Sequence, residues 1–283
     1  MTRLLSSLSL AFTTAFSLGA SAFSQAAPAE IVLSRDAHSA KIGDRVVSFI
    51  ARDLETGLTY VLEGSEPDER RGPWSTFKIP NLLIALETGA APSLEAQLPW
   101  NPDQRPPADY WPENWRQDQT LRSAFVRSSA WAFQDLALVI GSDAYQDILP
   151  TWSYGDAEVA DGSDTFWLDQ TLEISPREQV NFLDRLLNRE LGVSDASLVA
   201  LDAVSLAGQR PDGELHGKTG AGPVVLGDFD GRFEGWYVGY LTRETQAPVV
   251  FALHAEAASY AGIQTFRRQM AERLLSDVTA QID

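Results

Sequence analysis

Ser75-Thr76-Phe77-Lys78, followed far downstream by Lys218-Thr219-Gly220, is the most informative sequence in this chain. Residues three apart lie on the same face of a helix, so a helix that begins at Ser75 brings the Lys78 amine beside the Ser75 hydroxyl. A serine hydroxyl becomes a good nucleophile only when a neighbouring base takes its proton. The spacing therefore predicts an activated serine, with Lys218 as a second lysine that could hold an anionic substrate.

The segments that flank Ser75 predict strands before it and a helix after it. Val46 to Ala51 and Thr59 to Glu63 are β-rich runs joined by a hairpin signal. Apolar residues from Ile79 to Leu86 recur at helical spacing, and Gly89 ends that helix. Further along, the sequence predicts a loop at 92–115, a helical region at 124–140, a helix that begins at Ser175-Pro176-Arg177-Glu178, strands at 213–218, 236–241 and 249–254, and a final helix at 265–275.

The order of these elements predicts an α+β fold. Strands joined by short turns favour an antiparallel sheet. We expect this sheet to be flanked by helices, with an inserted all-helical subdomain at about residues 90–200. The rest of the chain adds no repeat or low-complexity segment, so one compact domain is expected.

The composition argues against several classes of partner and cofactor. The formal charge of −17 argues against a nucleic-acid partner, because such binding needs a basic face. The chain has no cysteine, which excludes a disulfide framework and thiolate metal sites. His38, His216 and His254 stand in no metal motif, so we expect no metal cofactor.

The first 22 residues have the features of a secretory signal peptide. Arg3 is the only charge before Glu30, residues 4–18 are mostly apolar, and Ala20-Ser21-Ala22 offers a cleavage site. The apolar run is short for a membrane span, and the alternative is a retained N-terminal anchor. We therefore expect a mature domain of residues 23–283 that is periplasmic or secreted and leaves the membrane after cleavage.

The sequence around the serine resembles a known family. Trp74 to Asn81, with Leu83 to Gly89 after it, closely resembles the nucleophile segment of class D (oxacillinase-type) serine β-lactamases, in the penicillin-binding transpeptidase-like superfamily. S-x-x-K and K-T-G are also signatures of class A β-lactamases and penicillin-binding proteins. The class D resemblance extends over residues 45–275. It implies a β-lactam substrate, an acyl-enzyme on Ser75, and Lys78 as general base after N-carboxylation by CO2.

The same resemblance implies roles for two further polar side chains. Ser128-Ser129-Ala130 stands where the family has S-x-V, and Ser128 would pass a proton between Lys218 and the leaving nitrogen. Trp167 matches a tryptophan whose indole N–H binds the carbamate on Lys78. Burial disfavours a charged ammonium, so a neutral Lys78 that can react with CO2 is chemically reasonable.

Substrate binding is implied for a third group of residues. The backbone N–H groups of Ser75 and Ala221 match the family's oxyanion hole. Thr219 and Gly220 would contact the substrate. Arg267 would hold the β-lactam carboxylate, with the adjacent Arg268 as the alternative.

Two positions depart from the family pattern. Ala130 replaces a valine that walls off the lysine pocket, which predicts a roomier or wetter pocket around Lys78. Asp156, in Tyr154-Gly155-Asp156, replaces an asparagine, so the site would lose a hydrogen bond or gain an anion that repels a substrate carboxylate. Both departures predict weak carbamylation and weak turnover.

Two other functions share the same serine and lysines. A penicilloyl-binding receptor, or a homologue with poor turnover, would stop at the acyl-enzyme. A cell-wall D,D-peptidase would also use S-x-x-K and K-T-G, but resembles the segment around Trp167 less well. The oligomeric state stays open between monomer and homodimer.

Overall fold

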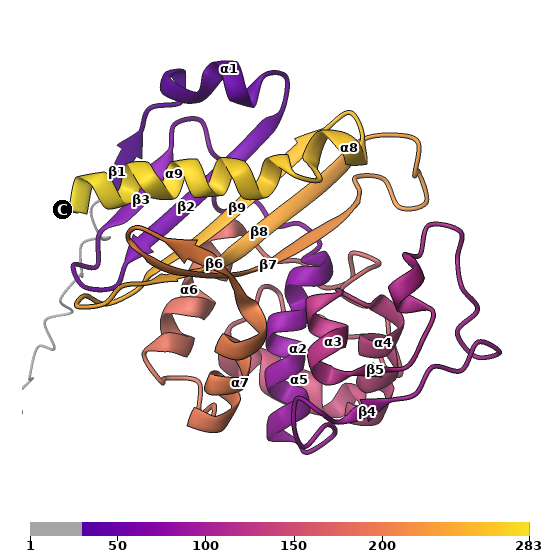
Figure 1. Ribbon diagram of the computed structural model, residues 1–283. Coiled ribbons are helices and arrows are strands. Elements are labelled where there is room, and N and C mark those ends of the chain that lie inside the picture. The colour runs from indigo at the N-terminus through magenta and orange to yellow at the C-terminus, as the bar shows by residue number, and fades with distance from the viewer. Residues whose placement is uncertain (1–29, 283) are drawn as a thin grey trace, which may run out of the picture.

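The computed structural model describes residues 30–282, so the expected signal peptide lies outside the described residues. Its centre is a seven-stranded sheet with the strand order β1-β3-β2-β9-β8-β7-β6 (Figure 1). The strands are β1 (Glu30–Leu33), β2 (Val46–Asp53), β3 (Thr59–Leu62), β6 (Leu206–Arg210), β7 (Gly213–Pro223), β8 (Phe233–Thr242) and β9 (Val249–Ala257).

The predicted α+β class, a sheet flanked by helices, is confirmed. All strand pairs of this sheet are antiparallel except β1 and β3, which run parallel. Neither β1 nor β6 was predicted. Each is a short edge strand, and of β1 only Leu33 is buried, so neither has a clear apolar alternation.

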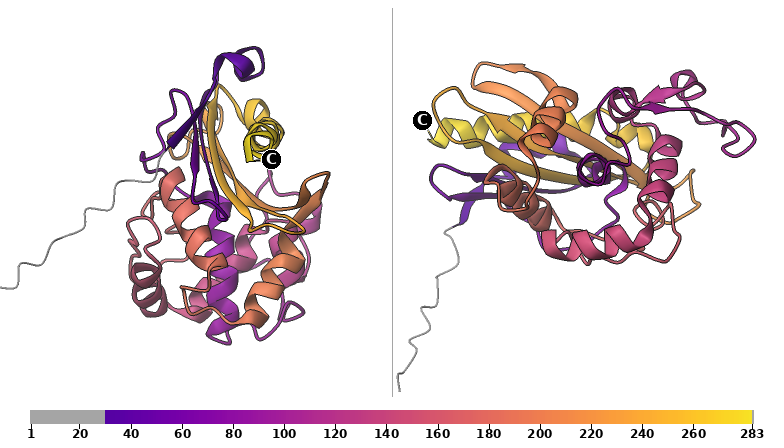
Figure 2. Two further views of the ribbon diagram at one scale, coloured as in Figure 1. Left: turned by 90° about the vertical axis from the view of Figure 1, so that its left-hand side faces the viewer. Right: turned by 90° about the horizontal axis from the view of Figure 1, so that it is seen from below.

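Helices cover both faces of the sheet. The helices are α1 (Ser39–Ile42), α2 (Lys78–Glu87), α3 (Leu121–Val126), α4 (Ala130–Ile140), α5 (Ser142–Trp152), α6 (Pro176–Leu187), α7 (Asp195–Ser205), α8 (Tyr260–Ile263) and α9 (Phe266–Ile282). Short 3-10 turns are η1 (Asp36–His38), η2 (Trp74–Phe77) and η3 (Glu113–Trp115), and β4 (Gln97–Leu98) pairs with β5 (Gln119–Thr120). Figure 2 shows α9 along one side of the sheet and the helices α2–α7 gathered on the other.

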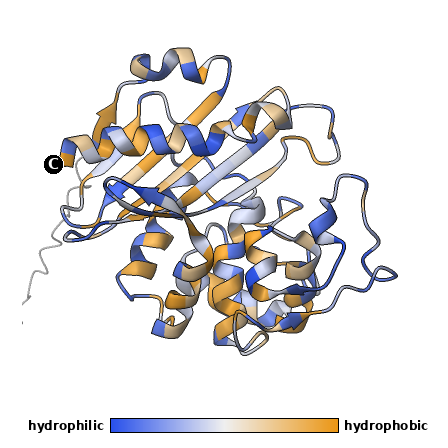
Figure 3. Cartoon of the chain, viewed as in Figure 1, coloured by the Kyte–Doolittle hydropathy of each residue, from blue (hydrophilic) through white to orange (hydrophobic). Residues whose placement is uncertain are grey.

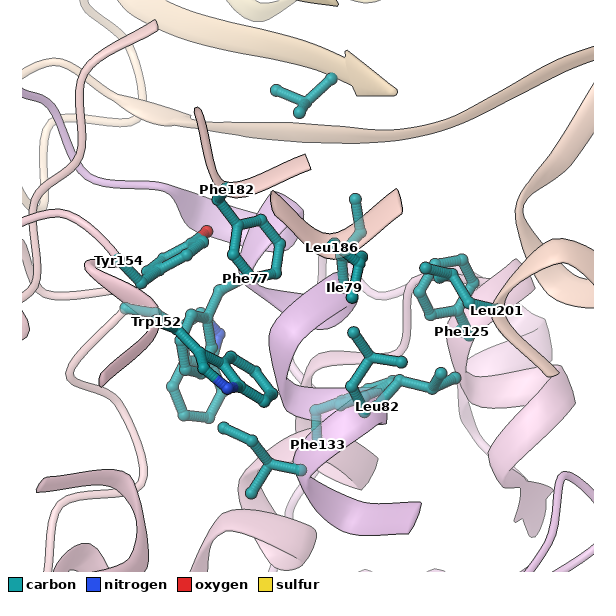
Figure 4. Packing of buried hydrophobic residues seen from close by; sticks show 14 of the residues in the cluster. Phe77, Ile79, Leu82, Phe125, Phe133, Trp152, Tyr154, Phe182, Leu186 and Leu201 are labelled. Carbon is teal, nitrogen blue, oxygen red and sulfur yellow. The ribbon is translucent and has the colours of Figure 1, made fainter. Parts of the chain in front are cut away.

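The hydrophobic core is divided by the sheet. One cluster lies under α9, where Leu274 and Leu275 are buried with Val47, Phe49 and Phe251. The larger cluster fills the helical part and surrounds α2, as Figure 4 shows. In Figure 3 the helices of this part carry orange and blue residues on different sides, as expected of helices with one buried face.

The segment at about residues 90–200, where an all-helical subdomain is expected, holds α3–α6 and the start of α7 together with the short strands β4 and β5. The helix α2, which precedes this segment, packs in the same hydrophobic cluster as α3–α7. The predicted start of α6 is confirmed in detail. Glu178 N–H donates to the Ser175 hydroxyl, Ser175 N–H donates to the Glu178 carboxylate, and Pro176 occupies the first turn.

The predicted helical region at 124–140 is two helices. α3 ends at Val126 and α4 begins at Ala130, and Ser128 between them has a φ of +59°. A left-handed conformation at a residue other than glycine is costly, so the surroundings must hold it in place. This break sets the direction of the Ser128 side chain.

Candidate active site

Ser75 lies on a tight turn that points its hydroxyl at Lys78. The turn η2 is a 3-10 helix rather than the start of an α-helix, and Lys78 is the first residue of α2. The Lys78 Nζ donates to the Ser75 Oγ over 3.0 Å. Ser75 is half-buried while its neighbours from Thr76 onward are buried, so Ser75 is the more accessible member of this pair.

Lys78 is completely shielded from solvent. Its amine lies 5.2 Å from the centre of the Phe133 ring, and burial lowers the pKa of Lys78 to about 7. A neutral amine is therefore well populated near neutral pH, and such an amine can accept a proton. Ala130 is half-buried at the start of α4, and Lys78 is fully enclosed without the valine of the family pattern.

A second serine and lysine meet on the other side of the site. The Lys218 Nζ donates to the Ser128 Oγ over 2.9 Å and to the Thr219 carbonyl over 3.0 Å. Burial holds the pKa of Lys218 well below its usual value, and the charges of Lys78 and Arg267 lower it further. The structure thus brings Ser75 of η2, Lys78 of α2, Lys218 of β7 and Ser128, between α3 and α4, into two short contacts.

The strand β7 passes close to the nucleophile turn. A Cβ on Gly220 would lie 2.9 Å from the Pro73 carbonyl oxygen and 3.1 Å from the Ser75 backbone nitrogen, so only glycine fits. The strand β6 pairs with β7 only as far as His216. Among the described strands, none pairs with the outer edge of β7 from Gly217 onward, which leaves this edge beside Ser75 for an extended ligand.

Arg267, and not Arg268, faces β7. The Arg267 side chain is buried at the start of α9, and its Nη1 donates to the Gly220 carbonyl over 3.0 Å. Arg268 points the other way, where it donates to Glu272 over 2.6 Å and to the Ala207 carbonyl over 2.9 Å. The cation nearest the K-T-G segment on this helix is therefore Arg267.

Trp167 is buried beside the nucleophile turn. Its ring stacks on Phe77, the residue before Lys78, with the centroids 5.2 Å apart. The indole Nε1 is buried and has no hydrogen-bond partner within residues 30–282. A buried donor without an acceptor is costly, and in an active site it indicates a position prepared for an anion or a polar ligand.

Asp156 is a turn residue in this structure. Its Oδ1 accepts from the backbone N–H of Glu158 over 3.2 Å and from that of Glu173 over 3.1 Å. A Cβ on Gly155, whose φ is +60°, would overlap the Glu173 carbonyl. The aspartate oxygen therefore holds the turn together, and an asparagine oxygen could accept the same two bonds.

Two further features of the structure were not predicted. Glu234 is buried beneath the nucleophile turn, where it contacts Trp74 and His254. A glutamate and a histidine inside apolar strands were the available signal. The second feature is an exposed ring stack of Tyr110 on Phe229, with centroids 5.9 Å apart, which joins the 92–115 loop to the loop between β7 and β8.

Within residues 30–282, no three His, Asp or Glu side chains are grouped as metal ligands would be. None of the helices in that range has the length and the apolar character that a membrane span requires.

Sequence comparisons link the chain to known proteins. Residues 62–276 match the penicillin-binding protein transpeptidase domain. The chain is 33% identical over 197 residues to the probable β-lactamase YbxI of Bacillus subtilis, covering 70% of each protein. It is 34% identical over 174 residues to β-lactamase OXA-11 of Pseudomonas aeruginosa, covering 62% of this chain and 63% of that enzyme.

Structural comparisons agree with these relatives. A class D β-lactamase from Sebaldella termitidis superposes with a TM-score of 0.77 at 26% identity, covering 89% of this chain and 99% of that one. The C-terminal domain of the BlaR penicillin receptor of Bacillus licheniformis superposes with the same TM-score at 25% identity, covering 88% and 96%.

Proposed function

The chain belongs to the penicillin-binding transpeptidase family and, within it, to the class D serine β-lactamases, and we propose that it hydrolyses β-lactams through an acyl-enzyme on Ser75. The contact between Ser75 and the fully buried Lys78 carries this proposal. An accessible hydroxyl beside an amine whose pKa is near 7 is an activated nucleophile. No metal is needed for this chemistry.

Acylation uses both serine–lysine contacts. Lys78, already N-carboxylated through its neutral amine, takes the proton of the Ser75 hydroxyl as Ser75 Oγ attacks the lactam carbonyl, and the backbone N–H groups of Ser75 and Ala221 stabilise the oxyanion. The carbon–nitrogen bond then breaks. Ser128 gives its proton to the leaving nitrogen and recovers one from Lys218, so the ring opens to an ester on Ser75.

Deacylation requires a base that still works after acylation. We assign this role to the carbamate on Lys78, which forms before acylation when the neutral amine binds CO2 and loses a proton. Once the proton taken from Ser75 has replaced the one that Lys218 gave up, the carbamate can take a proton from water. The buried Nε1 of Trp167, which has no partner within residues 30–282, supports this assignment as the donor to the carbamate. The activated water attacks the ester, the bond to Ser75 Oγ breaks, and the carbamate returns its proton to Ser75 Oγ as the opened β-lactam leaves.

The substrate would lie along β7. The edge that begins at Gly217 can receive the substrate amide as an added strand, with Thr219 and Gly220 alongside it. Arg267 is the proposed partner of the β-lactam carboxylate. Its contact with the Gly220 carbonyl supports this role, because it keeps the guanidinium beside the same strand.

A receptor that keeps its acyl group is the second candidate function. The likeness to the BlaR penicillin-receptor domain favours it, because that domain superposes as well as the class D enzyme does. A D,D-peptidase is a third. The three functions differ in the lifetime of the acyl-enzyme and in the substrate.

Timed intact-mass spectra of the purified protein with benzylpenicillin separate these functions. A β-lactamase gives a transient adduct and hydrolysed penicillin, whereas a receptor gives a lasting adduct. A peptidase instead cleaves a D-alanyl-D-alanine peptide. Ser75→Ala is the control and should keep the fold but form no adduct, so an adduct on that variant would contradict the assigned nucleophile.

Export is proposed from the first 22 residues, so that the mature domain, residues 23–283, acts in the periplasm or outside the cell. The only charge removed would be Arg3, and the formal charge would change from −17 to −18. N-terminal sequencing of the exported protein should begin near residue 23. An exported protein that still begins at Met1 would contradict cleavage.

A further inference from the structure

A buried carboxylate lies under the nucleophile turn and takes no part in the proposed chemistry. Glu234 on β8 is 1% exposed. Its Oε1 accepts from the Trp74 indole over 2.6 Å, and its Oε2 lies 3.0 Å from Nε2 of the buried His254 on β9. Burial of a carboxylate is unfavourable unless donors surround it. Here both oxygens have a partner, and one of them is the residue next to Ser75.

Trp74 is held in an unusual backbone conformation. Its φ is +50°, a region that residues with a Cβ rarely occupy. Its ring lies so close to β7 that a Cβ on Gly222 would overlap it. The hydrogen bond to Glu234 holds the indole nitrogen of the same ring. The side chain is therefore held at several points while the backbone stays strained.

Gly72, two residues before Trp74, is also hydrogen-bonded to β8. The Trp236 indole on β8 donates to the Gly72 carbonyl over 2.9 Å. Two indole hydrogen bonds, from Trp236 to Gly72 and from Trp74 to Glu234, thus connect β8 with the segment that precedes Ser75. The Ser75 backbone nitrogen follows Trp74 directly and lies against Gly220. A rotation of Trp74 would turn this N–H, which the proposed mechanism uses in the oxyanion hole.

We infer that Glu234, supported by His254, is a positioning residue that holds Trp74 and thereby aims the Ser75 N–H into the oxyanion hole. The inference rests on the proposed function. A donor displaced from the oxyanion loses much of its effect, since preorganised donors act through exact placement. Glu234 therefore acts on the rate of acylation rather than on substrate binding.

Glu234→Leu tests the inference, because leucine removes both acceptors and keeps an apolar shape. The limiting acylation rate constant with benzylpenicillin should fall about tenfold or more, with little change in the dissociation constant of the noncovalent complex. Glu234→Gln keeps an acceptor for the Trp74 indole and should retain most of the rate. An unchanged rate in Glu234→Leu would overturn the inference.

Asp53→Asn is the matched control for stability. Asp53, at the end of strand β2, is also a fully buried carboxylate, and it forms a salt bridge with Arg243 over 2.5 Å. This variant should lower the melting temperature without lowering the acylation rate of folded protein. An equal fall in rate would mean that Glu234 acts through general stability. If Glu234→Leu does not fold, Trp74→Phe removes the same hydrogen bond, and a wild-type acylation rate in it would overturn the inference.

A boronic acid that forms a reversible tetrahedral adduct with serine separates this inference from the proposed function. Its affinity should fall about tenfold or more in Glu234→Leu, because the adduct uses the same backbone donors. A wild-type protein that binds the boronic acid in this Glu234-dependent way, but is not acylated by penicillin, would contradict only the proposed function. Acylated wild type with equal boronic acid affinity in both proteins would contradict only the inference.

Discussion

The Lys218 amine donates a 2.9 Å hydrogen bond to the hydroxyl of Ser128, which lies 90 residues earlier in the chain. The contact depends on the left-handed conformation of Ser128 in the break between α3 and α4. Because burial lowers the pKa of Lys218, the amine can release a proton more easily than an exposed lysine can. The pair is thus suited to deliver a proton to a leaving nitrogen.

Ser128→Ala should slow acylation by about 10²–10⁴-fold, the usual contribution of a positioned general acid. Ser129→Ala is the control, because the Ser129 hydroxyl is buried and has no hydrogen-bond partner within residues 30–282. It should acylate at the wild-type rate. Stopped-flow measurement with a chromogenic cephalosporin gives both rates. Equal acylation rates for the two variants would show that Ser128 takes no part in the proton transfer.

Turnover should depend on pH and bicarbonate through Lys78. The pKa of Lys78 is lowered to about 7, and only the neutral amine reacts with CO2. Turnover should therefore be full above pH 7 and fall about tenfold per pH unit well below it, with partial recovery on added bicarbonate.

A Lys78 variant and spectroscopy complete this test. Lys78→Ala should acylate slowly and deacylate hardly at all, because it lacks the base that we assign to both steps. Carbon-13 bicarbonate should give a carbamate signal in the wild type and none in the variant. Bicarbonate-independent turnover without that signal would contradict the carbamylated base.

Much of the site could be predicted because its residues are adjacent in sequence or share one element. Ser75 and Lys78 are three residues apart, so any helical turn brings them together. The position of Lys218 on a strand could also be predicted, because the sequence around it has a β pattern. The start of α6 follows from a capping box, which is encoded in four consecutive residues.

Other parts of the site depend on packing between distant segments. Trp74, Glu234 and His254 meet only because β8 pairs with β9 and the nucleophile turn crosses them. The choice between Arg267 and Arg268 depends on how α9 is rotated against the sheet, and a weakly patterned helix does not specify that rotation. The parallel pairing of β1 with β3 likewise has no local signal.

Substitution of Ala130 and Asp156 by the residues of the family pattern should have little effect on turnover. Lys78 is already fully buried, so Ala130→Val removes no solvent from it. Asp156→Asn keeps an oxygen that can accept from Glu158 and Glu173. We expect the double variant to change turnover at saturating bicarbonate by less than about threefold, or about 0.6 kcal/mol. A rise in turnover of tenfold or more in steady-state assays would show that Ala130 and Asp156 weaken the site.

Arg267→Ala should weaken penicillin binding, whereas Arg268→Ala should not. Arg267 is buried beside Gly220, and loss of a charged hydrogen-bond donor to the substrate carboxylate should raise KM about 10- to 100-fold, equivalent to about 1.5–3 kcal/mol. Arg268 binds Glu272 on the exposed side of α9, so its removal should leave KM unchanged. A penicillin methyl ester separates recognition from damage to β7, because it lacks the carboxylate. If Arg267→Ala loses as much activity toward the ester as toward the free acid, Arg267 supports the strand and does not bind the carboxylate.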